Sequence, residues 1–229
     1  MDQPNPFDAL SRAGDLVQGN IGACLGVGFI YLIVSIALAV PSVVVEQFIG
    51  EGFGAGSDPD VAEIILVAGF LFITWLMQML VGAVLNLGLG RFALRLVDEG
   101  TAEVGDIIPD IDQVLHAIVA GFASSVVVTL GLMLCCVGVF AAYPCTLFWS
   151  FFLVDRRGNG LQAVGYGVQL VRGNLLPQIM FGGLIMVLAG FNAVLCCYIP
   201  SVIVIPFIHV ACALVYRQTR PVPVLLEER

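Results

Sequence analysis

The stretch from Gln113 to Val154, QVLHAIVAGFASSVVVTLGLMLCCVGVFAAYPCTLFWSFFLV, holds 42 residues and no Asp, Glu, Lys or Arg. A single helix of that length would measure about 63 Å, twice the thickness of the hydrocarbon core of a bilayer. A turn signal lies at its midpoint, where Gly138 follows Cys135 and Cys136. The stretch therefore predicts two membrane-spanning helices joined in a tight hairpin.

The same criterion divides the rest of the chain, because an ionised side chain at the bilayer centre costs at least about 2.5 kcal/mol. Two shorter charge-free runs, Leu16 to Val45 and Ile64 to Gly90, suit one helix each, and the run from Gly173 to Tyr216 suits a second hairpin that turns near Pro200. The sequence predicts an all-α integral membrane protein with six transmembrane helices, two single spans followed by two helical hairpins.

The arginines set the predicted orientation. All nine basic residues are arginines, and the six-helix arrangement places all nine on one side. Basic residues in short loops stay on the cytoplasmic side. Both termini are therefore predicted to be cytoplasmic, with the chain a multi-pass protein of the inner (plasma) membrane. The connection at 46–63, which is rich in Gly and carries five acidic residues and no basic one, is the predicted external loop.

Apolar residues recur every three or four positions in three cytoplasmic stretches, at 7–18, 107–115 and 161–172, which predicts amphipathic helices along the inner face. The predicted divisions are a cytoplasmic interfacial helix at 1–20, a transmembrane domain at 21–217 and a cytoplasmic tail at 218–229. Within the transmembrane domain, the loops at 91–113 and 155–172 are predicted to be cytoplasmic.

Several short motifs of the chain resemble a known family. The motifs are Gly88-Leu89-Gly90-Arg91, Asp98-Glu99-Gly100, Gly105-Asp106-Ile107-Ile108, Val154-Asp155 leading to Leu161-Gln162-Ala163, Leu170 to Asn174, and Cys196 to Pro200 with Pro206. They are similar to those of the uncharacterised bacterial polytopic inner-membrane proteins of the YciC type, which are related to the membrane domain fused to some glycerophosphodiester phosphodiesterases. The resemblance implies a helical membrane fold, no established activity and no phosphodiesterase residues here. The first hairpin tip departs from the family, with Val137-Gly138 in place of Pro-Gly.

Six polar side chains fall near the predicted midplane of the spans: Ser35, Gln78, Ser124, Ser125, Thr146 and His209. One interpretation is a polar layer that lines a transport site. The favoured alternative is hydrogen bonding between packed helices, with Gln78 as the expected partner of His209. No acidic or basic residue lies within a predicted span, which argues against an ion-coupled pump.

Seven cysteines invite a redox or metal interpretation. Cys24, Cys145 and Cys212 lie singly within spans, where cysteine behaves as a small apolar residue. Two adjacent pairs, Cys135 with Cys136 and Cys196 with Cys197, are predicted at the outer hairpin tips. Packing, disulfide formation in an oxidising compartment and a four-thiolate zinc site stay open for them, although adjacent cysteines do not have the usual zinc spacing. No metal site is predicted.

Small residues four positions apart let helices approach closely. Gly22 with Gly26 forms such a step in the first span, and Gly121 with Ser125 forms one in the third. Both steps predict helix packing, and the partner helix is expected to belong to the same chain.

The charge balance and the missing motifs limit the function. A net charge of −8 excludes a surface for nucleic acid. The chain has no HExxH, GxSxG or phosphate-loop motif, so no catalytic residue and no cofactor is predicted. An enzyme would need His116 with Asp110 or Asp112 at the inner surface.

The leading hypothesis is a non-enzymatic membrane protein that acts as an accessory subunit or as an organiser of membrane partners or lipids. Its expected partners are membrane lipids and either another membrane protein or a second copy of the chain. The competing hypothesis is a small uncoupled transporter or channel that uses the polar midplane layer.

Overall fold

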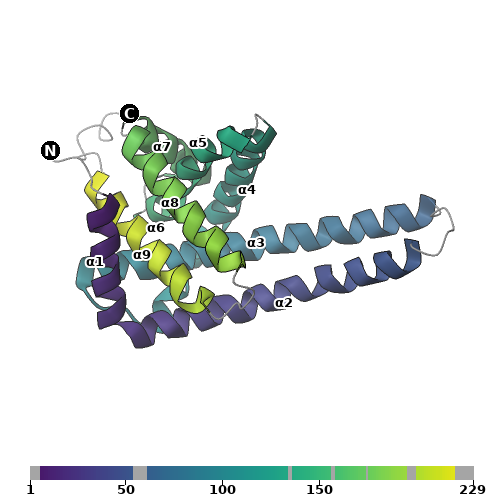
Figure 1. The fold of residues 1–229 in the computed structure, drawn as a ribbon, viewed down its shortest axis with the longest axis horizontal. Helices are drawn as coiled ribbons and strands as arrows, with labels where there is room; N and C mark the ends of the chain where they lie inside the picture. Colours follow the sequence, from purple (N-terminus) through teal and green to yellow (C-terminus); the bar gives the residue numbers. More distant parts are fainter. Residues whose placement is uncertain are drawn as a thin grey trace.

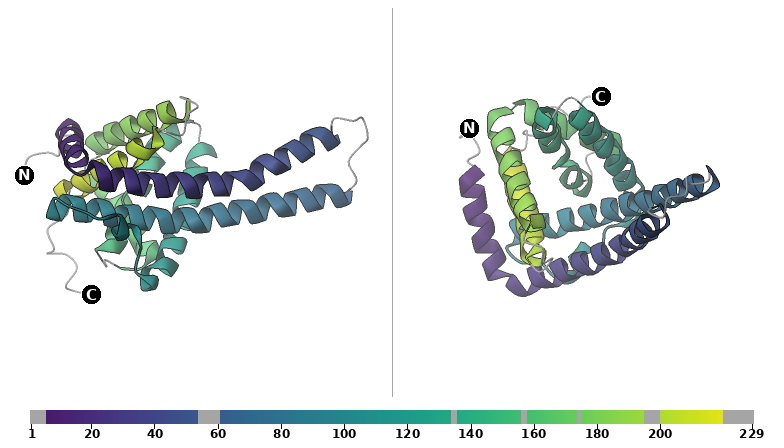
Figure 2. Two further views of the ribbon diagram at one scale, coloured as in Figure 1. Left: turned by 90° about the horizontal axis from the view of Figure 1, so that it is seen from below. Right: turned by 45° about the vertical axis from the view of Figure 1, so that its right-hand side comes forward.

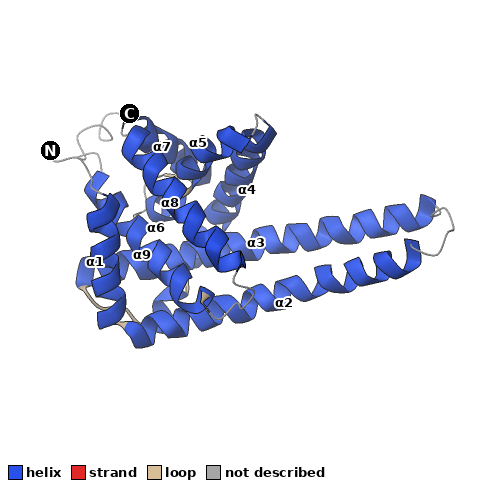
Figure 3. Ribbon diagram, in the orientation of Figure 1, coloured by secondary structure: helices blue, strands red, loops and turns tan. Residues whose placement is uncertain are grey.

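The computed structural model describes residues 6–53, 61–133, 136–155, 158–173, 175–194 and 200–219. Every regular element in these segments is helical (Figure 3). The elements are α1 (Pro6–Gly19), α2 (Ile21–Phe53), α3 (Val61–Glu99), the short 3-10 helix η1 (Val104–Ile107), α4 (Ile111–Met133), α5 (Cys136–Thr146), α6 (Trp149–Val154), α7 (Gly160–Gly173), α8 (Leu175–Val194) and α9 (Ser201–Thr219). The all-helical prediction is confirmed.

The longest helices, α2 and α3, run side by side and continue well beyond the other elements (Figure 1). The view from below, in the left panel of Figure 2, shows the same projecting pair. Their 33 and 39 residues correspond to about 50 and 58 Å of helix. The part of the pair that projects, residues 32–53 and 61–78, is called the α2–α3 arm below.

Helix α9 occupies the centre of the remaining structure. It packs against α1, α2, α3 and α8, and its residues from Val210 to Tyr216 are all buried. The second half of α3 supplies Leu87, Phe92 and Leu96 to the same core, and α6 contributes Phe151. The hydrophobic core therefore lies where α3, α6 and α9 meet, at one end of the long pair.

The helices α4, α5, α7 and α8 run obliquely to α2 and α3, so the molecule is not a parallel bundle (Figures 1 and 2). Two other contacts, α2 with α9 and α3 with η1, are backbone approaches too close for a side chain. A Cβ atom at Gly28 of α2 would lie 1.8 Å from the carbonyl oxygen of Val202 in α9, and one at Gly88 of α3 would lie 2.0 Å from that of Ile107. Only glycine fits at these two positions.

Local signals explain the helix ends. Helix α3 ends at Gly100, whose φ of 74° is the left-handed conformation that terminates helices, and whose N–H donates to the carbonyl of Leu96. Before α7, the side chains of Asn159 and Gln162 each accept a hydrogen bond of 3.0 Å from the other's backbone N–H. This reciprocal cap starts the helix after Gly158, which has a φ of 95°.

Four helical segments are long and apolar enough to cross a membrane: Ile21–Pro41, Ile64–Glu99, Ile111–Met133 and Ser201–Thr219. The pair α7 and α8, bent by 114°, gives a fifth if its two helices form one broken span. The chain is thus a multi-pass membrane protein by length and composition.

Helices extend into two of the predicted loops. The predicted external loop at 46–63 begins inside α2, which continues to Phe53, and ends inside α3, which begins at Val61. The predicted cytoplasmic loop at 91–113 begins inside α3 and ends inside α4, with η1 between them. Charge indicates where the hydrocarbon ends, and a helix can continue beyond that point, while the side of the membrane on which each loop lies stays a prediction.

The other predicted divisions can be compared with the helices directly. The interfacial helix at 1–20 corresponds to α1, and the helix at 161–172 to α7. The expected helix at 107–115 is divided between η1 and α4, with Pro109 between them. The tail at 218–229 lies outside the described residues except for its first two positions.

Candidate functional site

A network of charged side chains joins the ends of three helices far apart in the sequence. The guanidinium of Arg217, on α9, donates from Nε to Asp98 Oδ1 at 2.9 Å and from Nη1 to Asp155 Oδ2 at 3.0 Å. The hydroxyl of Tyr216 donates to the same Asp155 oxygen at 2.8 Å. Asp155 is only 13% exposed, and these donors compensate its carboxylate for the loss of water contact.

Two more arginines of α3 hold the connection between α3 and α4. Arg91 donates from Nη1 to Asp110 Oδ1 at 2.7 Å and to the carbonyl oxygen of Ile108 at 3.1 Å. Arg95 pairs with the buried Asp106 and with Glu99. Asp110 is therefore engaged by Arg91, while His116 is exposed on α4. This arrangement engages Asp110 in an ion pair with α3.

Aromatic rings lie directly beneath the charged network. The ring of Tyr216 stacks on Phe151 with a centroid separation of 5.6 Å and meets Phe152 edge to face at 5.0 Å. Phe152 also packs against Tyr166 of α7 at 5.4 Å. The apolar rings exclude water from the inner side of Arg217 and Asp155, which strengthens their hydrogen bonds.

The six polar side chains predicted near the midplane do not share one role. Ser125 donates to the carbonyl of Gly121 at 2.7 Å, and Thr146 donates to that of Tyr143 at 2.9 Å, each within its own helix. Gln78 donates across the α2–α3 pair to the carbonyl of Leu38 at 3.2 Å. Ser35 is half-buried on α2. The Oγ of Ser124 is buried and has no hydrogen-bond partner in the described part of the chain.

His209 has a side-chain partner that the sequence reasoning missed. Its Nε2 lies 3.3 Å from Oδ1 of Asn86 on α3, and its Nδ1 lies 3.0 Å from the carbonyl oxygen of Ile205. Gln78 was the expected partner, and Asn86 stands two helical turns further along the same helix. Asn86 is the only Asn within the predicted span at 64–90, and this fact could have drawn attention to it.

The residues of the two predicted packing steps differ in how closely other residues approach them. A Cβ at Gly26 would lie 2.6 Å from Val104, and one at Gly121 would lie 2.9 Å from Ala83. The hydroxyl of Ser125 lies 3.0 Å from the sulfur of Met79 on α3. A Cβ at Gly22 would have no atom within 4 Å, so its step with Gly26 stays a prediction.

The predicted cysteine pairs fall mostly outside the described residues. Cys135, Cys196 and Cys197 are not described, and Cys136 begins α5 without a described side chain. Cys24 and Cys212 are buried and Cys145 is half-buried, and none of the three is in a disulfide with a described residue. Among the described side chains there is no group of three or more His, Cys, Asp or Glu that would bind a metal ion.

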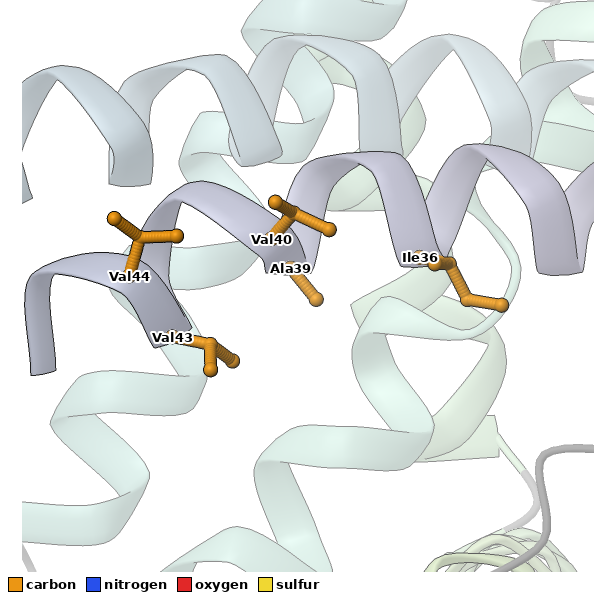
Figure 4. A pocket seen from close by; sticks show the side chains of 5 residues that line it. All are labelled: Ile36, Ala39, Val40, Val43 and Val44. Carbon is orange, nitrogen blue, oxygen red and sulfur yellow. The ribbon is translucent and has the colours of Figure 1, made fainter. Parts of the chain in front are cut away.

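One shallow groove lies on the α2–α3 arm. Its walls are aliphatic side chains of α2, which Figure 4 shows along one side of the helix: Ile36, Ala39, Val40, Val43 and Val44. A groove of this composition offers apolar contact and no polar group for catalysis.

No family model, no curated protein and no solved structure matches this chain, so the resemblance to the YciC-type family stays a prediction.

Proposed function

We propose that the protein is a non-enzymatic, six-span inner-membrane protein with cytoplasmic termini that acts as an accessory subunit or as an organiser of membrane partners or lipids. The observation that carries this proposal is the α2–α3 arm. Beyond the core, each of its two helices is packed against the other and projects away from the remaining elements (Figure 1).

The arm is apolar on its exposed surface. Sixteen large hydrophobic side chains between Ile33 and Val44 and between Val61 and Met77 are 39% to 74% exposed. Such a surface suits contact with acyl chains or with another membrane protein, because exposing so large an apolar area to water is unfavourable in free energy. A long, unaccompanied hairpin of this kind suits a protein that contacts partners within the bilayer.

The hydrogen bonds of the polar layer favour packing over transport. Ser125 and Thr146 bond to carbonyls of their own helices, and Gln78 bonds to the neighbouring arm helix. The first two bonds satisfy hydroxyls within one helix and the third joins two helices, which supports packing over a continuous polar path. The transport hypothesis would need these groups to face one passage.

The six-span topology is tested by reporter fusions along the chain. Alkaline phosphatase, which is active only outside the cytoplasm, is expected to be active when fused after Ser57 and inactive when fused after Gly100 or Asn159. Activity after Gly100 would reverse the orientation. Activity after Asn159, together with inactivity after Gly100, would contradict the prediction that the first hairpin crosses the membrane twice.

The organiser role is tested by native mass spectrometry of the full chain in mild detergent. A stoichiometric protein partner or a homo-oligomer is the expected result, and a lone monomer that retains one defined small solute would support transport instead. Photo-crosslinking sharpens the test. A benzoylphenylalanine in place of Phe72 on the arm, 61% exposed, should capture the partner, and one in place of Leu161 on α7, 64% exposed, should not.

A further inference from the structure

Three buried side-chain atoms in the described part of the chain have no hydrogen-bond partner. They are Oγ of Ser124 on α4 and both Nε2 and Oε1 of Gln178 on α8. Ser124 is 8% exposed and Gln178 is 1% exposed. Burying an unpaired hydroxyl or carboxamide is costly in free energy, and buried polar side chains are as a rule hydrogen-bonded. A ligand that supplies these hydrogen bonds would remove that cost.

Ser124 lies beside the end of α5. Helices α4 and α5 form a hairpin in which a Cβ at Gly138 would lie 2.3 Å from the carbonyl oxygen of Gly131. Seven residues back from Gly131, two turns along α4, is Ser124, and seven residues forward from Gly138 is Cys145. The hydroxyl of Ser124 is therefore level with the last turn of α5.

Gln178 lies beside the same end of α5. A Cβ at Gly182 would lie 2.4 Å from the ring of Pro144, and Gln178 is one turn earlier on the same buried face of α8. Helix α7, which precedes α8, contacts the next residue of α5, since a Cβ at Gly167 would lie 2.4 Å from the carbonyl oxygen of Cys145. The direction from Gly182 back to Gln178 thus follows α5 toward its end.

The helical hydrogen bonding is interrupted at this place, between α5 and α6. The N–H of Leu147 donates to the carbonyl of Pro144 at 3.3 Å, and that of Phe151 donates to the carbonyl of Phe148 at 3.1 Å. Both bonds run three residues back, so the regular α-helical pattern does not continue through the break. A helix end of this kind offers carbonyl oxygens to donors from outside the helix.

The unpaired atoms define the chemistry of the ligand. Nε2 of Gln178 is a donor, its Oε1 is an acceptor, and the hydroxyl of Ser124 is both. A cation would bind the oxygens and leave Nε2 unpaired, and an anion would leave Oε1 unpaired. A water molecule both donates and accepts, and a buried water typically has two to four polar partners.

We propose that Gln178 and Ser124 hold ordered water at the break between α5 and α6. The water bridges the carboxamide of Gln178 and the hydroxyl of Ser124 to the carbonyl oxygens at the end of α5. It supplies the donors that a continuous helix would provide, as ordered waters do at other broken helices within membranes. The break is thus a hydrated joint between α5 and α6.

The direct test is water-edited solid-state NMR of the full chain in liposomes, with nitrogen-15 in the side-chain amides of glutamine. The signal of Gln178 is assigned by its disappearance in Gln178→Leu. Magnetisation is expected to pass from water to Nε2 of Gln178 in the wild-type protein. A Gln178 signal that receives none overturns the proposal, whether or not the variants fold.

The thermal midpoint of Gln178→Leu in nanodiscs distinguishes a hydrated carboxamide from a dry one by its sign. In a dry site, leucine would replace an unpaired amide by an apolar side chain, and the midpoint would rise. In a hydrated site, leucine removes the hydrogen bonds between the carboxamide and the water, and the midpoint should fall by about 2 to 4 °C. A rise or an unchanged midpoint contradicts the proposal.

Ser124→Ala should also lower the midpoint, and its matched control is Ser125→Ala. The hydroxyl of Ser125 donates to the carbonyl of Gly121 in its own helix, so its loss should have a smaller effect. Because one water site serves both side chains, Ser124→Ala and Gln178→Leu should be less than additive in combination, and strict additivity would show that they share no water. A wild-type midpoint that rises with sodium chloride but not with choline chloride would identify a bound cation and overturn the proposal.

Discussion

Arg217 and Asp98 lie 119 residues apart in the sequence and form a two-point hydrogen-bonded pair, from Nε to Oδ1 at 2.9 Å and from Nη2 to Oδ2. The third guanidinium nitrogen, Nη1, reaches Asp155 at 3.0 Å. One side chain thereby joins the ends of α3, α6 and α9. Because a guanidinium presents its donors in a fixed plane, the pairing sets the relative height of the three helix ends.

Replacing Arg217 by Leu is expected to destabilise the protein by about 1 to 3 kcal/mol. The reason is that Asp155, 13% exposed, would lose a charged donor while it stays in partly buried surroundings. Thermal unfolding in nanodiscs measures the change. The matched control is Glu99→Gln, which removes an exposed pair on α3 and should leave the midpoint unchanged. Equal midpoints for the two variants would show that Arg217 adds no stability.

Tyr216→Phe removes the hydroxyl of Tyr216 and keeps its ring, so it measures the contribution of the hydroxyl alone. The ring contacts with Phe151 and Phe152 stay, but the 2.8 Å hydrogen bond to Asp155 is lost. We expect a loss of about 1 to 2 kcal/mol in the free energy of unfolding. Tyr216→Leu should lose more, because Tyr216 is fully buried and its ring fills the core. Denaturant titration of the purified protein compares them, and identical losses would mean that the ring contributes nothing beyond the hydroxyl.

A single methyl group added at Gly28 is expected to disrupt the crossing of α2 and α9. The new Cβ would lie 1.8 Å from the carbonyl oxygen of Val202, so the backbones must separate. We expect Gly28→Ala to cost about 1 to 3 kcal/mol or to reduce the yield of monodisperse protein.

Gly22→Ala is the matched control for the crossing, since a Cβ at Gly22 meets open space in the same helix. Size-exclusion chromatography and thermal unfolding should distinguish the two variants. A Gly28→Ala protein as stable as Gly22→Ala would show that α2 and α9 do not approach as closely as described here.

Hydrophobicity and charge predicted the all-helical class because they act locally. The turns of the two predicted hairpins lie at or beside segments outside the described residues, between Met133 and Cys136 and between Val194 and Pro200. The second half of the first hairpin was predicted as one span, whereas it is divided into α5, of 11 residues, and α6, of 6 residues. Run length indicates how much helix there is, but it does not indicate where a helix breaks.

The relations between helices could not be predicted in the same way. The grouping of the arginines on one side of the membrane stays a prediction, and nothing in the sequence indicated that Arg217 would pair with Asp98 across 119 residues. His209 was assigned to Gln78, whereas helix geometry brings Asn86 to it. Such pairs depend on the crossing angles and the relative axial positions of the helices, which cannot be derived from the local periodicity of the sequence.

The last prediction concerns the α2–α3 arm. Ile73 is 61% exposed on α3 and lies nine residues into the charge-free run that begins at Ile64, which places it about 14 Å into the hydrocarbon. Ile73→Arg is expected to cost about 2.5 to 3.5 kcal/mol of insertion energy and to lower the amount of protein integrated in the membrane.

Two controls separate burial in lipid from a general effect of a new charge. Ile73→Leu keeps the apolar surface, and Leu161→Arg places the same charge at a position of α7 that is 64% exposed. Resistance to alkaline carbonate extraction of the membrane fraction should fall for Ile73→Arg alone. If Leu161→Arg lowers it equally, then α7 also faces hydrocarbon and its position along the inner surface is wrong. If neither variant has an effect, the arm does not lie in the bilayer.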